Sequence, residues 1–214
     1  MLNQIEIRRL SNLNHSDWMK IRKKYVEKNI FDKKKAIKNL IDIKEVFDEC
    51  KISFWLIGGT LLGAVREKDF ISWDDDVDIA VYEEDFLPKY DILKEKFILK
   101  GFIFRNTRKS IGTKITLWRE GPKNSIDCLF LKSDYEKNKY RLSRIRRHPR
   151  KYFEKYGTIE FKGTTFRIPY PAEKYLAFMY KNWEKPIKSS EPEMKWRNRN
   201  IYWRKNVHKG EDWR

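Results

Sequence analysis

Residues 73–81 read WDDDVDIAV, and this short stretch is the starting point for both the predicted fold and the predicted chemistry. From Asp76 onward, carboxylate and aliphatic residues alternate, which is the period of a β-strand with one buried face. Alternate side chains of a strand share a face, so Asp76 and Asp78 project together while the aliphatic residues enter the core. Two carboxylates about 7 Å apart on one face repel each other unless a cation lies near them. The stretch therefore predicts a strand that presents a cation site.

Three further acids bear on this cation site. Asp74 has the same parity as Asp76 and would add an outer contact, whereas Asp75 should point elsewhere. Asp127 is the one acid in the apolar strand predicted at 125–131, SIDCLFL. Two interpretations of Asp127 stay open: a paired structural acid, or a ligand that completes a metal site from a neighbouring strand. Hard divalent cations such as Mg²⁺ take oxygen ligands of this kind and usually bind substrate phosphates as well.

Residues 57–60, IGGT, place a glycine pair between a predicted buried strand and a predicted helix. Glycine lets a backbone come close to phosphate oxygens, and a helix N-terminus adds positive potential. A Gly-Gly pair alone is also typical of a tight turn. The order of elements is more informative: strand, glycine pair, helix, loop, strand with two Asp, and a later strand with one Asp. This order suits phosphates held between glycine amides and a metal bound by three carboxylates, as in two-metal phosphoryl transfer.

The remaining patterns predict an α+β fold, a single mixed β-sheet flanked by helices. Apolar spacing predicts a helix at 33–50, and helical composition covers 84–98 although Pro88 lies within it. Other elements are strands at 52–57, 102–105, 113–119 and 125–131, a hairpin at 158–169 turning at Lys162–Gly163, and a helix at 172–180. We expect three parts: a helical basic segment at 1–32 packed on the core, a catalytic domain at 33–186, and a basic, aromatic-rich tail at 187–214.

Composition limits the classes of partner. The 214 residues include 48 Lys and Arg against 31 Asp and Glu, a formal net charge of +17. This excess favours polyanions, phosphorylated small molecules or an anionic membrane surface. Apolar runs are far shorter than the roughly 20 residues of a membrane helix, and the first residues lack a signal-peptide core, so we expect a cytoplasmic protein. Two cysteines without a CxxC pair and three scattered histidines disfavour a zinc site, so oxygen ligands would hold any metal.

Residues 58–81, GGTLLGAVREKDFISWDDDVDIAV, resemble the signature of the LicD/fukutin-type transferases, a branch of the nucleotidyltransferase fold superfamily. The resemblance extends over about 33–186, including the SIDCLF strand and the closing hairpin and helix. It implies that Asp76, Asp78 and Asp127 are catalytic metal ligands and that Gly58, Gly59 and Thr60 form the phosphate loop. Two positions depart from the family pattern: Lys181 stands where many members have Gly, and Ser72 where Pro is frequent.

The resemblance also implies a reaction. Such enzymes use Mg²⁺ or Mn²⁺, here two ions, and a CDP-activated donor. They transfer a phospho-group such as phosphocholine or ribitol phosphate to a hydroxyl of a glycan or lipid-linked glycan, and CMP leaves. We expect Asp127 to orient or deprotonate the acceptor hydroxyl. Arg66 and Lys114 are candidates for donor phosphate contacts, with plain surface charge an equal alternative. Trp73 could form the wall of a pocket or anchor the core, and we favour the core anchor. Modification of lipopolysaccharide, capsule or teichoic acid fits this scheme.

Two other functions remain in view. A nucleotidyltransferase would use the same three carboxylates to attach a nucleotide to RNA, protein or a small molecule and would release pyrophosphate. Nucleotidyltransferases usually have Gly-Ser after the strand, so the Gly58-Gly59 pair and the family-specific WDDDVD count against this function, and we do not expect nucleic acid as a partner. A basic binding module with a degenerate active site is disfavoured by the intact acids. The tail at 187–214 could bind a phosphorylated acceptor or the anionic inner face of a membrane.

Overall fold

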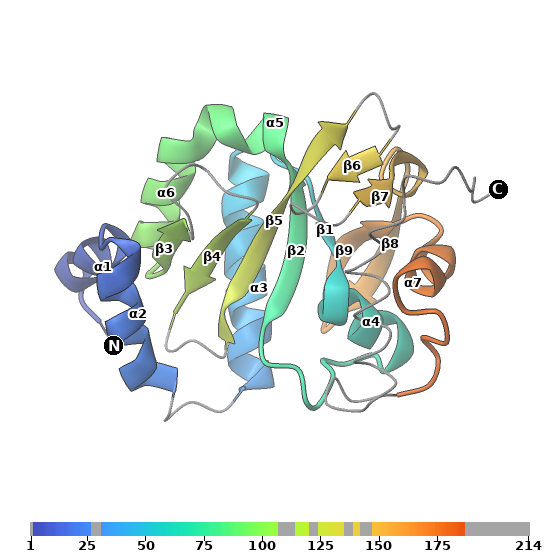
Figure 1. The fold of residues 1–214 in the computed structure, drawn as a ribbon, viewed down its shortest axis with the longest axis horizontal. Coiled ribbons are helices and arrows are strands. Elements are labelled where there is room, and N and C mark those ends of the chain that lie inside the picture. The colour runs from blue at the N-terminus through green and yellow to red at the C-terminus, as the bar shows by residue number, and fades with distance from the viewer. Residues whose placement is uncertain are drawn as a thin grey trace.

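A mixed β-sheet forms the centre of the computed structural model, which describes residues 2–26, 31–106, 114–119, 124–134, 139–141 and 147–186 (Figure 1). Seven strands follow the order β3-β4-β5-β2-β1-β9-β8. Their bounds are β1 Phe54–Leu56, β2 Val77–Tyr82, β3 Ile103–Asn106, β4 Lys114–Trp118, β5 Ile126–Asp134, β8 Tyr156–Phe161 and β9 Thr164–Pro169. Two short strands, β6 Lys139–Arg141 and β7 Arg147–Pro149, continue from the far end of β5. The predicted α+β fold with a mixed sheet is confirmed.

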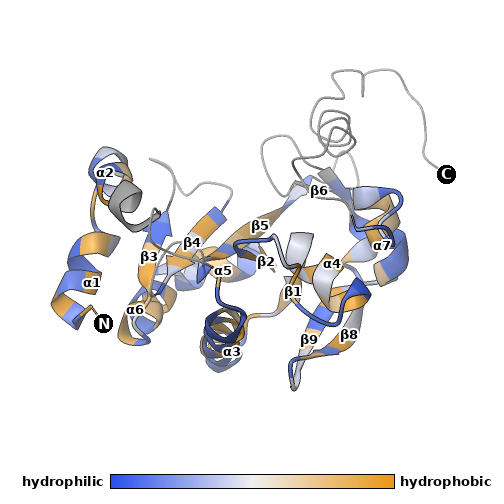
Figure 2. Cartoon of the chain, turned by 90° about the horizontal axis from the view of Figure 1, so that it is seen from below, coloured by the Kyte–Doolittle hydropathy of each residue, from blue (hydrophilic) through white to orange (hydrophobic). Residues whose placement is uncertain are grey.

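The strand directions bring the predicted site residues to one end of the sheet. β2 pairs in parallel with β5 and antiparallel with β1, while β9 runs parallel to β1. The carboxyl end of β1 therefore lies beside the amino ends of β2 and β5. Burial follows the expected alternation only in part, because Val77, Ile79 and Val81 are fully buried and Ala80 between them is buried as well. Hydrophobic residues run along these central strands (Figure 2).

Helices cover the sheet and its edges. α3 crosses behind the sheet beside α6, α1 and α2 lie at the β3 edge, and α4 and α7 lie on the side of β1, β9 and β8 (Figure 1). Their bounds are α1 Gln4–Ser11, α2 His15–Val26, α3 Lys33–Glu49, α4 Gly58–Arg66, α5 Glu83–Phe86, α6 Tyr90–Leu99 and α7 Ala172–Tyr180, with 3-10 turns at Leu87–Lys89 and Arg150–Tyr152. Phe47 of α3 packs against Phe54, Phe86 and Phe97, which joins α3, the sheet and α6 in one core.

Most predicted elements are found near their expected bounds. The helix at 33–50, the strands around the two acidic segments, the hairpin at Lys162–Gly163 and the last helix are all present. The segment at 84–98 is instead divided into α5, a 3-10 turn and α6, because Pro88 has no N–H to donate and starts a new turn. β6 and β7 form within a basic segment for which we predicted no strand.

The remaining expectations concern the cysteines, membrane-spanning helices and the division of the chain. Cys128 is buried and Cys50 is half-buried, and both are free thiols. None of the helices among the described residues has the length and apolar character needed to cross a membrane. The division at residues 32 and 186 stays a proposal, and the tail at 187–214 lies outside the described residues.

Candidate active site

The glycine pair forms the junction between β1 and α4. Gly58 has φ +59°, a left-handed conformation that suits glycine, and α4 begins at this residue. The residue before it, Ile57, makes no side-chain capping hydrogen bond to the N–H groups of the first turn. Such a turn is suited to an anionic ligand when positive charge lies nearby.

The same two glycines make room for carboxylates. A Cβ atom on Gly58 would lie 2.1 Å from Asp78 Oδ2, and one on Gly59 would lie 1.9 Å from Asp74 Oδ2. Both distances are far inside van der Waals contact. The glycine pair is therefore required by the acidic residues packed against it, whether or not a phosphate also binds there.

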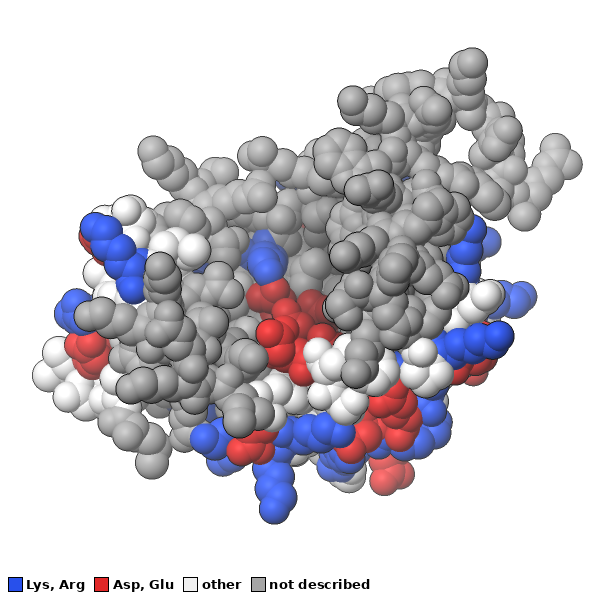
Figure 3. Space-filling model, turned by 60° about the horizontal axis from the view of Figure 1, so that its bottom comes forward, with Lys and Arg blue, Asp and Glu red and all other residues white. Residues whose placement is uncertain are grey.

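Asp76, Asp78 and Asp127 come together at this junction. The parallel register of β2 and β5 sets Asp78 directly beside Asp127, and Asp76 stands just before β2. Oxygen atoms of the three carboxylates lie within 4.8 Å of one another. Asp74, Asp75 and Asp76 form a second group of the same kind, which shares Asp76. The acids gather at the centre of one face of the molecule (Figure 3).

The electrostatics of this cluster favour a bound cation. Burial raises the pKa of Asp76 to about 7, and repulsion from the neighbouring carboxylates adds to the rise. Burial likewise raises the pKa of Asp74 to about 6. The pKa of Asp78 is raised well above its usual range by burial and then by Asp76 and Asp127. All donor atoms are carboxylate oxygens, so the set fits a hard divalent cation such as Mg²⁺ or Mn²⁺.

Asp127 has protein partners on both oxygens. Thr116 donates its hydroxyl to Oδ1 at 2.7 Å, and the Lys114 ammonium pairs with Oδ2. Lys114 therefore lies at the cluster, where its described contact is with Asp127; its contact with the donor phosphates stays a prediction. Thr116 was not among the predicted site residues. The sequence did contain a pattern that could have found Thr116. Lys114 and Thr116 are two residues apart, so they share one face of the predicted strand at 113–119.

Thr60 and Arg66 are placed differently from Lys114. The buried Thr60 hydroxyl accepts a hydrogen bond from the Asp78 backbone N–H at 2.9 Å, which joins α4 to β2. Arg66 stands at the far end of α4, about 12 Å along the helix from Gly58. Its guanidinium donates to the Trp183 carbonyl at 2.9 Å and to Glu67 at 2.6 Å. Phosphate contacts from Thr60 and Arg66 stay predictions, while the described contacts of both are structural.

The loop between α4 and β2 holds the acidic run in place. A Cβ atom on Gly63 would lie 2.4 Å from the Asp69 carbonyl oxygen, so the loop folds back closely along α4. The Asp69 carboxylate pairs with Lys33 at 3.0 Å and with Lys162 at 2.7 Å. Burial acts to raise the pKa of Asp69, but hydrogen bonds led by those from Lys162 and Lys33 outweigh it and lower the pKa to about 2.

Trp73 corrects one prediction. Its side chain is 37% exposed, so the interpretation as a core anchor is wrong. Exposed Ser72 precedes it and half-buried Asp74 follows it, and this part of the loop runs over the surface on its way to β2. Trp73 thus stands next to the acidic run at the surface.

Comparisons with known proteins agree with this geometry. The family model described as LicD/FKTN/FKRP, nucleotidyltransferase domain, matches residues 51–171, more than half of the chain. The lipopolysaccharide cholinephosphotransferase LicD of Haemophilus influenzae is 40% identical over 55 residues, which cover 25% of this chain and 21% of that protein. The ribitol 5-phosphate transferase FKRP of Homo sapiens is 50% identical over 40 residues, 19% of this chain and 8% of that protein.

A solved structure extends the comparison to the fold. The lincomycin-bound lincosamide antibiotic adenylyltransferase LnuA has a TM-score of 0.50 at 12% identity, covering 78% of this chain and 96% of that one. At this identity the likeness shows a shared nucleotidyltransferase-like fold alone. The matched stretches span about a fifth or less of the full length of the two curated relatives.

Proposed function

The chain belongs to the LicD/FKTN/FKRP nucleotidyltransferase-domain family, and we propose that it is a metal-dependent phosphotransferase. It moves a phospho-head group from a CDP-activated donor to a hydroxyl of a cell-surface glycan and releases CMP. The observation that carries this proposal is the meeting of Asp76, Asp78 and Asp127 beside the uncapped first turn of α4. The matched relatives are named for transfer of phosphocholine and ribitol 5-phosphate, which are head groups of this class.

The carboxylates of Asp76, Asp78 and Asp127 are the proposed ligands of Mg²⁺ or Mn²⁺. When bound, the cation would neutralise the donor diphosphate and stabilise the charge that develops on the transferred phosphoryl group. Asp74 and Asp75, which share a second acidic group with Asp76, are the proposed place for a second ion. The raised pKa values of Asp74 and Asp76 support this assignment, because carboxylates that repel one another bind either protons or a cation, and a cation can take the place of the protons near neutral pH.

The protein's own groups bind and orient the two substrates. The N–H groups of Gly58 and Gly59 at the start of α4 offer donors to phosphate oxygens of the CDP-linked donor. Asp127 is proposed to accept a hydrogen bond from the acceptor hydroxyl and to take its proton. Each carboxylate oxygen has two lone pairs, so the bonds from Lys114 and Thr116 leave Asp127 able to accept one more.

The test is to measure CMP release from a panel of CDP-linked donors (choline, ribitol, glycerol and ethanolamine) with Mg²⁺ or Mn²⁺. We expect CMP from one donor, with activity lost in Asp76→Asn and Asp127→Asn by more than about 100-fold, since loss of a ligand should exceed the effect of losing its supporting partners. Asp48→Asn is the matched control: it removes an exposed acid that pairs with Lys44 on α3, and it should retain activity.

Two results would count against the proposal. Equal activity in Asp127→Asn and Asp48→Asn would remove Asp127 from the reaction. Pyrophosphate release from a nucleoside triphosphate, with the nucleotide retained on the product and CMP absent from every donor, would replace head-group transfer by nucleotidyl transfer.

The acceptor and the cellular site are part of the same proposal. A glycan or lipid-linked glycan would be met at a membrane surface, and the basic residues of the tail at 187–214 suit peripheral contact with anionic lipid. Deletion of this tail should abolish binding to anionic vesicles and leave CMP release from the donor unchanged. Binding to vesicles that survives the deletion would refute a role for the tail in membrane contact.

A further inference from the structure

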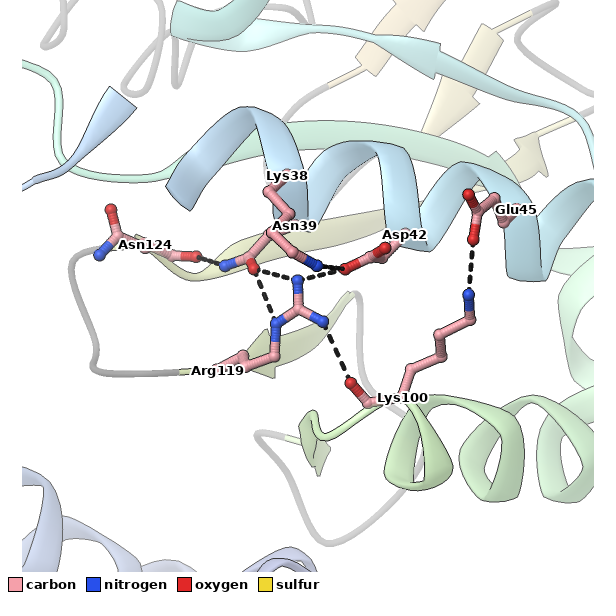
Figure 4. Close-up of polar contacts among 7 residues, drawn as sticks. All are labelled: Lys38, Asn39, Asp42, Glu45, Lys100, Arg119 and Asn124. Atoms are coloured by element: carbon pink, nitrogen blue, oxygen red, sulfur yellow. Dashed lines mark hydrogen bonds and ion pairs between the residues drawn. The ribbon is translucent and has the colours of Figure 1, made fainter. Parts of the chain in front are cut away.

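A buried amide on α3 links two segments that lead into the active site. Asn39 is only 3% exposed, and both halves of its side chain are used (Figure 4). Its Oδ1 accepts hydrogen bonds from Arg119 Nε at 2.9 Å and Nη2 at 2.6 Å. Its Nδ2 donates to the Asn124 carbonyl at 3.1 Å. The Asn39 amide therefore joins Arg119 to Asn124 from behind the sheet.

Arg119 and Asn124 stand at the two sides of the connection between β4 and β5. Arg119 directly follows β4, and Asn124 precedes β5 by two residues. Both residues make further contacts with α3, α6 or the residues that flank these helices. Arg119 donates to the Lys100 carbonyl at 3.1 Å, pairs with Asp42, and lies 4.4 Å from the centre of the Phe102 ring. Asn124 Oδ1 accepts from the Asp32 N–H, just before α3, at 2.9 Å.

A short path of hydrogen bonds leads from Asn124 to the carboxylates. The next residue, Ser125, accepts a hydrogen bond through its carbonyl from the Val77 N–H at 3.0 Å. Val77 stands between Asp76 and Asp78, and Asp127 follows Ser125 by two residues. The contact between Ser125 and Val77 therefore lies at the start of the parallel pair of β2 and β5, whose register brings Asp78 beside Asp127.

We propose that Asn39 is a positioning residue for the carboxylate cluster. It fixes the position of the start of β5 relative to α3. Through Ser125 and Val77 it thereby sets the spacing between Asp78 and Asp127. An aliphatic residue at position 39 would take the hydrogen-bond partner from the carbonyl of the buried Asn124 and from two donors of the half-buried Arg119. The start of β5 would then be free to move against β2. This inference rests on the proposed function in one respect, that the carboxylates hold a divalent cation.

The test uses the full chain with Asn39→Leu and Asn39→Asp. Asn39→Leu removes both halves of the link, whereas Asn39→Asp keeps the acceptor for Arg119 and loses the donor to Asn124, so it serves if Asn39→Leu fails to fold. Ile43→Ala is the matched control, because Ile43 is fully buried on the same side of α3 and contributes no polar group. Mn²⁺ affinity is measured by calorimetry, and amide exchange at Val77 by hydrogen–deuterium exchange without metal.

We expect both Asn39 variants to bind Mn²⁺ at least about tenfold more weakly and to exchange Val77 about tenfold faster. Ile43→Ala should lower the melting temperature and leave Mn²⁺ affinity within about twofold. Unchanged exchange and affinity in the Asn39 variants, or equal changes in Ile43→Ala, would overturn the inference. A wild-type chain that binds no Mn²⁺ would refute the proposed function, while faster Val77 exchange confined to the Asn39 variants would still support the positioning role.

Discussion

Asp127 and the acidic run at Asp74–Asp76 form two sides of one cluster, yet they are held in different ways. Asp127 lies within β5, and hydrogen bonds from Thr116 and Lys114 fix its carboxylate. The acidic run stands on the loop before β2 and depends on space that Gly59 leaves for Asp74 and on ion pairs at Asp69 that are partly open to solvent. Bonds within the sheet fix the one proposed ligand on β5, and we expect the loop side to adjust when a cation or donor binds.

The largest effect should come from filling the space that Gly58 leaves for the Asp78 carboxylate. Gly58 and Gly163 both have positive φ, so an Ala at either position costs about 1–2 kcal/mol in backbone strain. A Cβ on Gly163 meets nothing within 4 Å, whereas a Cβ on Gly58 would collide with the Asp78 carboxylate. We expect Gly58→Ala to lower CMP release by at least about 100-fold, since it displaces a proposed ligand. Melting temperature and CMP release are measured for both variants.

Gly163→Ala is the control for this substitution. It should lose stability through strain alone and retain most of its activity. If the two variants lose equal activity, the close approach between Gly58 and Asp78 has no part in the reaction, and the glycine pair is only a turn.

The sequence predicted more of the strand side than of the loop side. Alternation in DVDIAV and a lone acid in SIDCLFL were enough to place Asp78 and Asp127 on strands, because period two is a local signal. The pairing of Asp78 with Asp127 could not be derived from either segment, since strand register depends on contacts distant in the sequence. The exposure of Trp73 depends on the path of a loop, which no periodicity describes.

Arg66 shows a similar limit to what the sequence can predict. Its position beside the motif suggested a phosphate contact, but the Trp183 carbonyl that it binds lies 117 residues further along the chain. Only the folded arrangement brings that acceptor to the end of α4. Local pattern thus identified the acidic residues, and tertiary contacts decided which basic residue stands with them.

The next effect in size is stabilisation by a cation, which should depend on pH. The folded-state pKa of Asp76 is about 7 against an ordinary 3.8, so stability without metal falls as pH rises through this interval. At lower pH, protons on the carboxylates already relieve their repulsion, and a cation must displace these protons to bind. At pH 8 and about 100 times its Kd, Mn²⁺ should add about 2.7 kcal/mol, or roughly 5–10 °C in melting temperature. At pH 5.5 the gain should be clearly smaller.

Asp78→Asn separates this effect from general binding of cations to the surface. It removes one carboxylate from a cluster of mutually repelling acids, so it should melt higher than wild type at pH 8 without metal and gain little from Mn²⁺. Equal gains at the two pH values, or an equal gain in Asp78→Asn, would show that Mn²⁺ acts elsewhere on the chain.

The smallest effect should come from the support behind the loop side. Asp69→Asn weakens the pairs with Lys33 and Lys162, which are partly exposed, so we expect a loss of about 1 kcal/mol or less at neutral pH. The folded-state pKa of Asp69 is lowered to about 2, so its contribution is present above the ordinary value of 3.8 and is lost as pH falls through about 2. The difference in melting temperature between wild type and Asp69→Asn should therefore shrink in acid.

Mn²⁺ affinity then compares the two sides directly. Asp69→Asn leaves every proposed ligand in place and loosens only the loop, so affinity should fall by a few-fold, less than the roughly tenfold loss expected for Asn39→Leu behind the strand side. Lys162→Met, which removes one of the two pairs, should fall between Asp69→Asn and wild type. A loss in Asp69→Asn as large as that in Asn39→Leu would mean that the loop needs its ion pairs as much as β5 needs its buried amide. The loop before β2 would then be held as firmly as β5, and the two sides of the site would not differ.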